Sequence, residues 1–157
     1  QLIQLRWQMT SKPRGNIKVK LVETQTEKES CFDIRTQVFV GEQGVDITHE
    51  IDGYDETCVH AIAFVETKPV GTGRMIHISD TEAQIGRMAV LPEWRRSCTG
   101  TKILDLLEDT AKTAGITRIV LHAQVYVQNF YEVNGYTATG DIFLDENIEH
   151  ILMYKEV

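Results

Sequence analysis

Apolar and polar residues recur along this chain with two different periods. Steps of three and four over 27–40 and 101–114 predict amphipathic helices, and in the second of these Glu108 and Lys112 are expected to pair on the polar side. Alternation over 17–22 predicts a half-buried strand. The remaining elements are expected as strands at 58–66, 70–77, 85–91, 116–123, 136–140 and 150–155 and as a helix at 125–133.

A strand, a polar turn and a helix follow one another in the middle of the chain. The apolar run 85–91 ends at a proline, and the helix of 101–114 begins after the turn at 94–100. Free N–H groups at a helix start carry partial positive charge, and Arg95 and Arg96 add guanidinium donors. The sequence therefore predicts either a diphosphate-binding turn or an ordinary connection with solvated arginines. The glycine signatures of P-loop and dinucleotide sites are absent.

Composition limits the class of protein. The chain has 157 residues, of which 42% are hydrophobic and 25% charged, and this suits one globular domain. We expect residues 1–15 to be a tail, either a disordered arm or residues introduced by cloning, and residues 16–157 to form the domain. Three cysteines without C-x-x-C spacing argue against a disulfide framework and a zinc site. Without a membrane-length apolar run or a signal-peptide pattern, we expect a cytoplasmic protein with no membrane partner.

Charge is distributed unevenly along the chain. The formal net charge is −7, yet the first twenty residues carry only basic charges, so the rest of the chain is more acidic than the whole. An acidic body argues against a nucleic-acid partner and favours an amine-bearing ligand. Residues 36–67 contain acidic side chains but no lysine or arginine. This segment is either an acidic rim that attracts a cationic amine or a solvated surface loop.

Several motifs occur in an order that resembles the GNAT superfamily of N-acetyltransferases. The acetyl-CoA diphosphate motif of that family is matched by Val90, Pro92, Arg95, Cys98 and Gly100. The match continues on both sides of this motif, at 35–45, 121–124, 129–132, 135–136 and 148–153. The first of these segments resembles the first helix of a small-molecule branch that includes glyphosate-type N-acetyltransferases.

The resemblance implies an α/β (α+β) architecture, the GNAT fold. In this fold a single mixed, mostly antiparallel sheet of six to seven strands is flanked by about four helices. The central strand, here 85–91, bulges and splays away from the parallel strand that follows, here 116–123.

The resemblance also implies acetyl-CoA as co-substrate and direct transfer, in a ternary complex, to the primary amine of a small molecule. Backbone groups of Met88, Ala89 and Val90 would bind the pantetheine arm and polarise the thioester, and Asn129 would also bond the arm. Cys98 stands where the family has a glycine, so we expect weakened diphosphate binding. The predicted diphosphate site comprises Arg95, Arg96, Ser97, Cys98, Thr99, Gly100 and Thr101.

Two residues match the catalytic positions of the family. Tyr131 matches the general acid that protonates the sulfur of CoA, and the alternative for it is a packed aromatic ring. His150 matches the histidine that takes the proton from the amine. The competing bases are His60, His122 and a water relayed through Glu50 or Asp52. No pair of histidines has metal-ligand spacing, so no metal is expected.

The acceptor is predicted only as a small primary amine, such as an amino acid, a polyamine or an amino sugar. Arg87 either pins a substrate carboxylate or pairs with Glu42, Glu50 or Asp52 as scaffolding. The candidate substrate residues are therefore Arg87, Glu50, Asp52 and His60. Val40 stands where glyphosate enzymes present an arginine, which weakens a glyphosate-like preference. The alternatives are a non-catalytic acyl-CoA-binding or sensor domain, suggested by Cys98, and a peptide or protein acetylase. The oligomeric state is left open.

Overall fold

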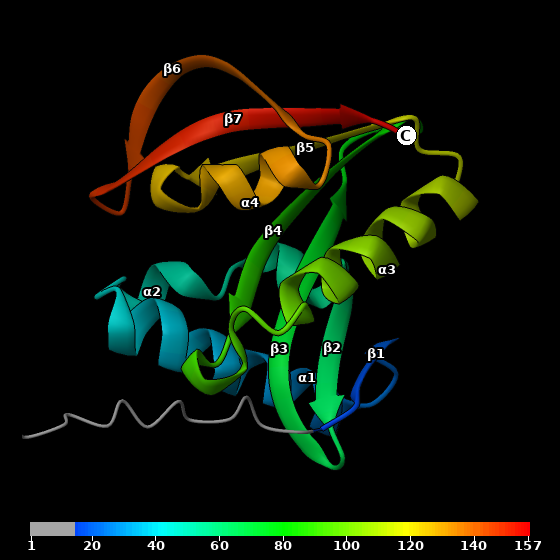
Figure 1. Ribbon diagram of the computed structural model, residues 1–157, viewed down its shortest axis with the longest axis vertical. Coiled ribbons are helices and arrows are strands. Elements are labelled where there is room, and N and C mark those ends of the chain that lie inside the picture. Colours follow the sequence, from blue (N-terminus) through cyan, green and yellow to red (C-terminus); the bar gives the residue numbers. More distant parts are fainter. Residues whose placement is uncertain (1–14) are drawn as a thin grey trace, which may run out of the picture.

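A computed structural model describes residues 15–157. Residues 1–14 lie outside the described range, and with them nearly all of the predicted tail. The described chain forms one seven-stranded sheet in the order β1-β2-β3-β4-β5-β7-β6 (Figure 1). β4 and β5 are parallel and every other neighbouring pair is antiparallel, which confirms the expected mixed sheet. The strands are β1 (Ile17–Leu21), β2 (Val59–Val65), β3 (Lys68–His77), β4 (Glu82–Val90), β5 (Arg118–Gln124), β6 (Thr137–Asp145) and β7 (Ile148–Glu156).

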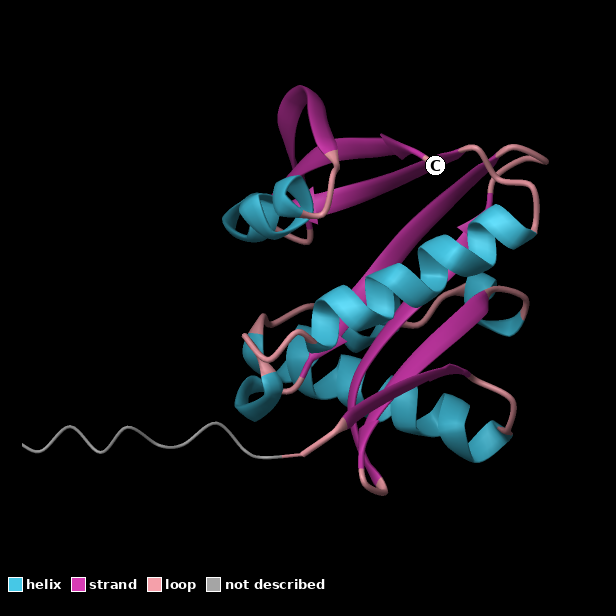
Figure 2. Cartoon of the chain, turned by 45° about the vertical axis from the view of Figure 1, so that its right-hand side comes forward, coloured by secondary structure: helices cyan, strands magenta, loops and turns pink. Residues whose placement is uncertain are grey.

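Helices cover both faces of this sheet. α1 lies behind β2 to β4 in Figure 1, α2 lies to the left of β4, α3 crosses in front of the strands, and α4 lies beside β5 and β6 (Figures 1 and 2). Thr24 starts the first helix, because its hydroxyl accepts a hydrogen bond from the Glu27 N–H at 3.1 Å. The predicted helix 27–40 therefore begins earlier, and beyond Arg35 it continues as a π-helix, Thr36–Glu42. The helices are α1 (Gln25–Arg35), α2 (Ile47–Glu50), α3 (Thr99–Thr113) and α4 (Gln128–Val133).

Two C-terminal elements differ from their predicted extent. The strand predicted at 136–140 runs on to Asp145 as β6, with a register shift after Thr139 where Gly140 has φ +76°. Most of its side chains are exposed, so the apolar pattern gave no sign of the extension, which comes from pairing with β7. The helix predicted at 125–133 begins with a 3₁₀ turn at Val125–Val127 before α4.

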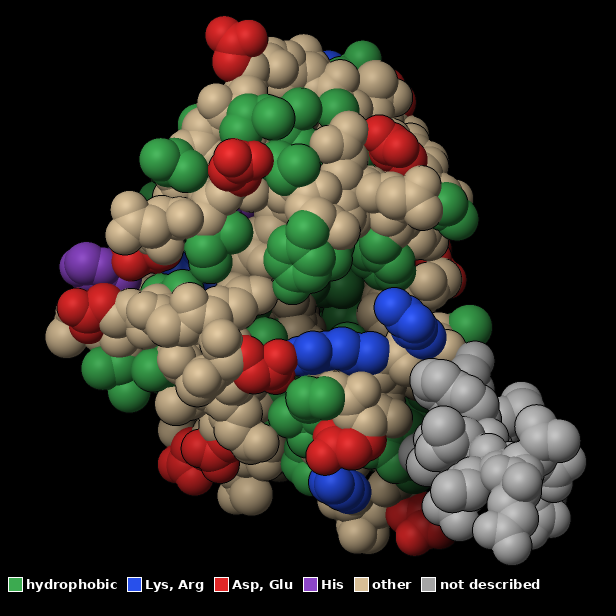
Figure 3. Space-filling view, turned by 60° about the vertical axis from the view of Figure 1, so that its left-hand side comes forward, with side chains coloured by type: hydrophobic (Ala, Val, Ile, Leu, Met, Phe, Trp, Pro, Cys, Tyr) green, Lys and Arg blue, Asp and Glu red, His purple; other side chains and the backbone are tan. Residues whose placement is uncertain are grey.

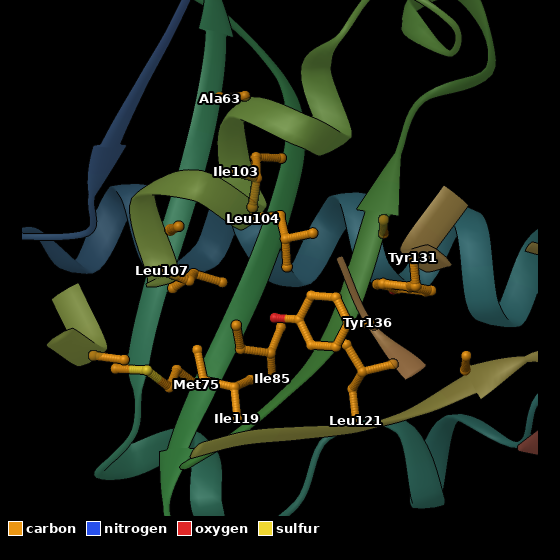
Figure 4. Packing of buried hydrophobic residues seen from close by; sticks show 14 of the residues in the cluster. Ala63, Met75, Ile85, Ile103, Leu104, Leu107, Ile119, Leu121, Tyr131 and Tyr136 are labelled. Atoms are coloured by element: carbon orange, nitrogen blue, oxygen red, sulfur yellow. The ribbon is translucent and has the colours of Figure 1, made fainter. Parts of the chain in front are cut away.

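The core lies mainly between α3 and the sheet (Figure 4). Gly73 lets this helix come close, because a Cβ there would lie 2.5 Å from Met88 Sδ and 2.9 Å from Ile103 Cγ2. Among the described residues, no helix is long and apolar enough to cross a membrane. The buried side chains that meet in Figure 4 include Ala63, Met75, Ile85, Ile103, Leu104, Leu107, Ile119 and Leu121.

One prediction about α3 was wrong. Glu108 does not pair with Lys112 on a solvated side of the helix, since it is only 4% exposed. Its carboxylate accepts hydrogen bonds from the Tyr136 hydroxyl at 3.0 Å and from Lys155 Nζ at 2.9 Å. The C-terminal part of the chain covers this side of α3, which the helical period alone could not reveal.

Candidate functional site

The sheet splits between its two parallel strands. β4 and β5 pair only at Glu82–Gln84 with Arg118–Val120, and beyond this point the strands diverge (Figures 1 and 2). β4 also bulges against β3. Gly86 and Ala89 are three residues apart on β4, but their partners on β3, Arg74 and Thr72, are only two apart, and Arg87 within the bulge has φ +51°. The predicted splay is therefore confirmed. The β4 edge at Met88, Ala89 and Val90 has no β5 partner, so its backbone groups on that side, other than Val90 O, have no partner in the sheet and can meet a ligand in the gap.

The turn after β4 presents a helix start to this gap. Lys102 N–H bonds to Cys98 O, so the N–H groups of Thr99, Gly100 and Thr101 have no acceptor within α3. The turn is held from inside, because Thr99 Oγ1 donates to Trp94 O at 3.2 Å and the Ser97 hydroxyl donates to the same carbonyl. Free, rigidly held N–H groups at a helix start suit a diphosphate, so the residues present fit the CoA group predicted for them.

The two arginines of the turn differ in their surroundings. Arg95 Nε donates to Val90 O at 2.9 Å, and its Nη2 donates to Glu42 Oε1 at 2.7 Å. Arg95 thus joins the end of β4 to the end of the π-helix. Arg96 is exposed and has φ +58°. Figure 3 shows the molecule from the left of Figure 1, with a hollow lined by hydrophobic side chains and bordered by Lys or Arg side chains.

The backbone conformation of Cys98 was not predicted from the sequence. Its φ is +68°, in the left-handed region where only glycine is unstrained. The glycine of the family motif is therefore explained by backbone conformation, in addition to close approach. The thiol is exposed and caps nothing at the start of α3.

Cys98→Gly should stabilise the fold by about 1 kcal/mol, because the left-handed conformation costs a side chain about this much. It should also tighten acetyl-CoA binding. Urea unfolding and calorimetry measure the two effects, with Cys98→Ala as the control that removes the thiol and keeps the Cβ. Equal stability of the glycine and alanine variants would show that backbone strain is absent.

Tyr131 lies between α4 and the diverging end of β4 (Figure 4). Its ring is 8% exposed and packs edge-on against Phe130 and Tyr136, at centroid distances of 5.0 and 5.9 Å. Within residues 15–157 its hydroxyl makes no hydrogen bond, and burial raises the pKa of the phenol. The ring is packed, as one of the two alternatives predicted, and the role of the hydroxyl as general acid stays a prediction. Asn129, on the same helix, is exposed.

His150 lies on the other side of the β5–β7 layer. Leu121 and Ala123 of β5 are buried, so Gln124 points to the opposite face, and His150 is its partner on β7. The imidazole is 9% exposed and stacks on Phe143 at 5.8 Å. Its Nδ1 lies 2.7 Å from Ile148 O, which fixes the proton on Nδ1 and leaves the Nε2 lone pair unused. His122 meets the edge of the Phe143 ring at 5.3 Å.

The acidic segment 36–67 is neutralised from outside. Arg35 pairs with Glu50 at 2.8 Å and with Asp55 at 2.7 Å, and both carboxylates are at most 2% exposed. Burial alone would raise the pKa of Asp55, but hydrogen bonds from Arg35 and from the Asp52 N–H, with the arginine charges, bring it well below its usual range. Glu50 and Asp55 therefore belong neither to a solvated loop nor to an open acidic rim, the two alternatives predicted for this segment.

Two further arginines complete this buried network. Arg74 binds Asp52 at 2.7 Å and Asp55 at 2.8 Å. Arg87 lies 3.3 Å from Glu50 and 3.4 Å from Asp52, so the scaffolding alternative predicted for it is what the structure shows. Of the three partners predicted as alternatives for it, Glu50 and Asp52 are the ones present, and Glu42 binds Arg95.

His60 belongs to the same region but is enclosed. Its Nε2 lies 3.0 Å from Asp55 O and 3.4 Å from Cys58 Sγ, and burial lowers the pKa of the imidazole. The donor atoms of these three residues lie within 4.8 Å of one another. Both Asp55 oxygens already accept hydrogen bonds from Arg35, and this positive charge opposes a metal ion at that point.

Contacts that the sequence did not predict join the two sides of the gap. The side-chain amides of Gln43 and Gln124 bond each other twice, at 3.0 and 2.8 Å, and Gln43 also donates to the Tyr126 hydroxyl at 3.2 Å. His49 Nδ1 lies 2.8 Å from Glu146 Oε1. No local pattern could have revealed these pairs, because their members lie 81 to 97 residues apart in the chain.

A family model described as an acetyltransferase (GNAT) domain matches residues 24–157. The chain belongs to the GNAT acetyltransferase family. This GNAT protein is 34% identical over 142 residues to the uncharacterised protein YyaT of Bacillus subtilis (strain 168), covering 88% of this chain and 95% of YyaT. It is 31% identical over 141 residues to YjcF, an uncharacterised N-acetyltransferase of the same strain, covering 89% and 100%. The predicted superfamily is thereby confirmed, and the glyphosate-type branch stays a prediction.

Solved structures share the fold of this GNAT protein. Escherichia coli ElaA superposes with a TM-score of 0.80 at 23% identity, covering 90% of this chain and 100% of ElaA. A GNAT family acetyltransferase from Elizabethkingia anophelis, solved with acetyl-CoA bound, has a TM-score of 0.71 at 18% identity, covering 90% and 99%. Membership of the GNAT acetyltransferase family makes this protein an acyltransferase with acetyl-CoA as its co-substrate, as predicted.

Proposed function

We propose that this GNAT protein transfers the acetyl group of acetyl-CoA to the primary amine of a small molecule, by direct attack in a ternary complex. The observation that carries the proposal is a pair of proton-transfer atoms on opposite sides of the β5–β7 layer. The Tyr131 hydroxyl and His150 Nε2 both lack a partner among residues 15–157. The Tyr131 hydroxyl faces the α4 side of the splay, and His150 Nε2 faces the side of α1 and α2.

In this proposal one residue serves each proton transfer of the reaction. The amine nitrogen attacks the thioester carbon, so that a C–N bond forms and the C–S bond breaks. His150 Nε2 takes the proton that the nitrogen releases, and Tyr131 gives its proton to the leaving sulfur. Burial raises the pKa of Tyr131, which keeps the phenol protonated as an acid requires. Unpaired N–H groups of β4 beyond Gln84 would stabilise the oxyanion.

The diphosphate of CoA would lie at the start of α3. The N–H groups of Thr99, Gly100 and Thr101 supply donors there. A Cβ on Gly100 would lie 3.2 Å from Phe130 Cζ, so this glycine keeps α4, with Asn129 and Tyr131, close to the turn. In this proposal Gly100 thus keeps the proton donor, Tyr131, close to the diphosphate site.

Release of free CoA with a panel of small amines tests the proposal. Turnover with at least one amine supports it. Acetyl-CoA binding without turnover on any amine would favour the acyl-CoA-binding or sensor alternative, for which Cys98 is the motivating feature. Faster acetylation of histone-like peptides than of any small amine would favour a peptide acetylase.

His150→Gln should lower kcat by about 100-fold, because a positioned general base contributes about this much. The pH dependence of kcat should differ between the wild type and the variant, because the variant has no base at this position. The measurement is a pH–rate profile of both proteins at saturating acetyl-CoA. The control is His77→Gln, which changes an exposed histidine at the far end of β3. An unchanged profile in His150→Gln would remove this residue as the base.

A further inference from the structure

The side of the splay that faces α1 and α2 has two walls. One wall is the π-helix with α2, and the other is the end of β5 with the β6–β7 hairpin (Figure 1). The Gln43 to Gln124 amide pair and the His49 to Glu146 contact join them. We call the five residues that make these contacts the acceptor mouth: Gln43, His49, Gln124, Tyr126 and Glu146.

Neither wall supplies a lysine or an arginine to this mouth, and the histidine of the mouth, His49, lies 2.8 Å from Glu146. Residues 36–67 contain no lysine or arginine, and neither do residues 119–154. Arg87 and Arg95 reach the region from β4 and from the turn, and both are bound to carboxylates at 2.7 to 3.4 Å. The hairpin instead carries acidic groups at both ends of its turn, including Glu146. A carboxylate on the acceptor would meet the like charge of Glu146 there, and the arginines that approach from β4 and from residue 95 are already paired.

An aromatic surface lies beside the acceptor mouth. Gln124, His150 and Phe143 are register partners across β5, β7 and β6, so their side chains share one face. Phe143 lies between His150, at 5.8 Å, and His122, at 5.3 Å. Tyr126 of the mouth is 74% exposed. His150 is itself nine-tenths buried in this row with Nε2 unpartnered, which marks the place of the reacting nitrogen.

From this arrangement we propose that the acceptor is a monoamine with an apolar, preferably aromatic, body and no carboxylate. The inference rests on the proposed function and narrows it, since amino acids and glyphosate-like anions are then poor substrates. The amine nitrogen meets His150 Nε2, and the apolar body lies on Phe143 and Tyr126. The acidic groups of the hairpin favour the approach of the protonated amine.

The test compares acceptors that differ only in the carboxyl group: phenethylamine, phenylalanine and phenylalanine amide, with acetyl-CoA saturating. The kcat/KM for phenethylamine should exceed that for phenylalanine by at least about 100-fold, because like charges placed together oppose binding strongly. Phenylalanine amide, which has no carboxylate charge, should recover most of the difference. Equal use of phenethylamine and phenylalanine would overturn the inference and leave the proposed function standing. No turnover with any amine would overturn both.

A charge reversal tests the location of the effect. Glu146→Lys should raise the phenylalanine to phenethylamine ratio of kcat/KM by about tenfold, because it places a cation at the mouth. The matched control is Glu132→Lys, the same change at an exposed position on α4. Phe143→Leu should raise KM for phenethylamine several-fold more than KM for methylamine. Equal shifts of the ratio in both lysine variants, or no selective effect of Phe143→Leu, would show that the mouth does not select the acceptor.

Discussion

Tyr131→Phe should lower kcat by at least about 100-fold and leave the KM for acetyl-CoA almost unchanged. A positioned general acid contributes 10²- to 10⁴-fold, roughly, and a hydroxyl that acts only on the leaving sulfur adds little to ground-state binding. The ring packs against Phe130 and Tyr136 and its hydroxyl makes no hydrogen bond within the described residues, so its removal should cost little stability. Steady-state kinetics and thermal unfolding of the variant measure both expectations.

Tyr136→Phe is the matched control, because it removes the same atom from the neighbouring ring. The Tyr136 hydroxyl donates to the buried Glu108 carboxylate at 3.0 Å, so its loss should cost about 1–2 kcal/mol of stability. The rate should stay near that of the wild type. A Tyr131→Phe enzyme with full kcat, or an equal loss of kcat in both variants, would contradict the acid role.

Asp55→Ala should destabilise the protein by about 3–5 kcal/mol, since it breaks two buried ion pairs and leaves Arg35 with Glu50 alone and Arg74 with Asp52 alone. Asp55 is 1% exposed and binds Arg35 at 2.7 Å and Arg74 at 2.8 Å. Urea unfolding measures the loss. Asp141→Ala, an exposed change on β6, is the control and should stay within about 0.5 kcal/mol of the wild type. A loss below about 1 kcal/mol for Asp55→Ala would show that the network contributes little.

The same network predicts the acid sensitivity of the fold. The folded-state pKa values of Asp52 and Asp55 lie below the ordinary value of 3.8, so the unfolded chain binds protons more readily than the folded one. Their stabilisation is complete above the unfolded pKa and is lost as the pH falls towards the folded values. Asp55→Ala should therefore show a shallower loss of unfolding free energy between pH 5 and pH 3, roughly, than the wild type. Equal slopes would contradict this account.

The sequence predicted best where one element carried its own signal. The helical period placed Ile103, Leu104 and Leu107 on the core face of α3, and they are fully buried. Pro92 marked the end of the central strand, and β4 ends two residues before it. The bulge and the splay have no local pattern, and they were expected only from the family resemblance.

The remaining features depend on contacts between distant parts of the chain. Glu108 was misplaced because Tyr136 and Lys155 arrive from 28 and 47 residues away. Pairing of Arg87 with Glu50 or Asp52 was among the predicted alternatives, but the acidic segment gave no sign that arginines from α1 and β3 would enter it. The strain at Cys98 depends on a backbone angle that a motif does not state.

The central claim is that CoA lies in the splay with its diphosphate at the start of α3. Calorimetric titration of the wild-type protein with acetyl-CoA, and with acetyl-pantetheine, which has no diphosphate, tests it most directly. The structure predicts one-to-one binding of acetyl-CoA and much weaker binding of acetyl-pantetheine. Equal binding of the two compounds would contradict the diphosphate site. Absence of acetyl-CoA binding, in the wild type and in Cys98→Gly alike, would contradict the account as a whole.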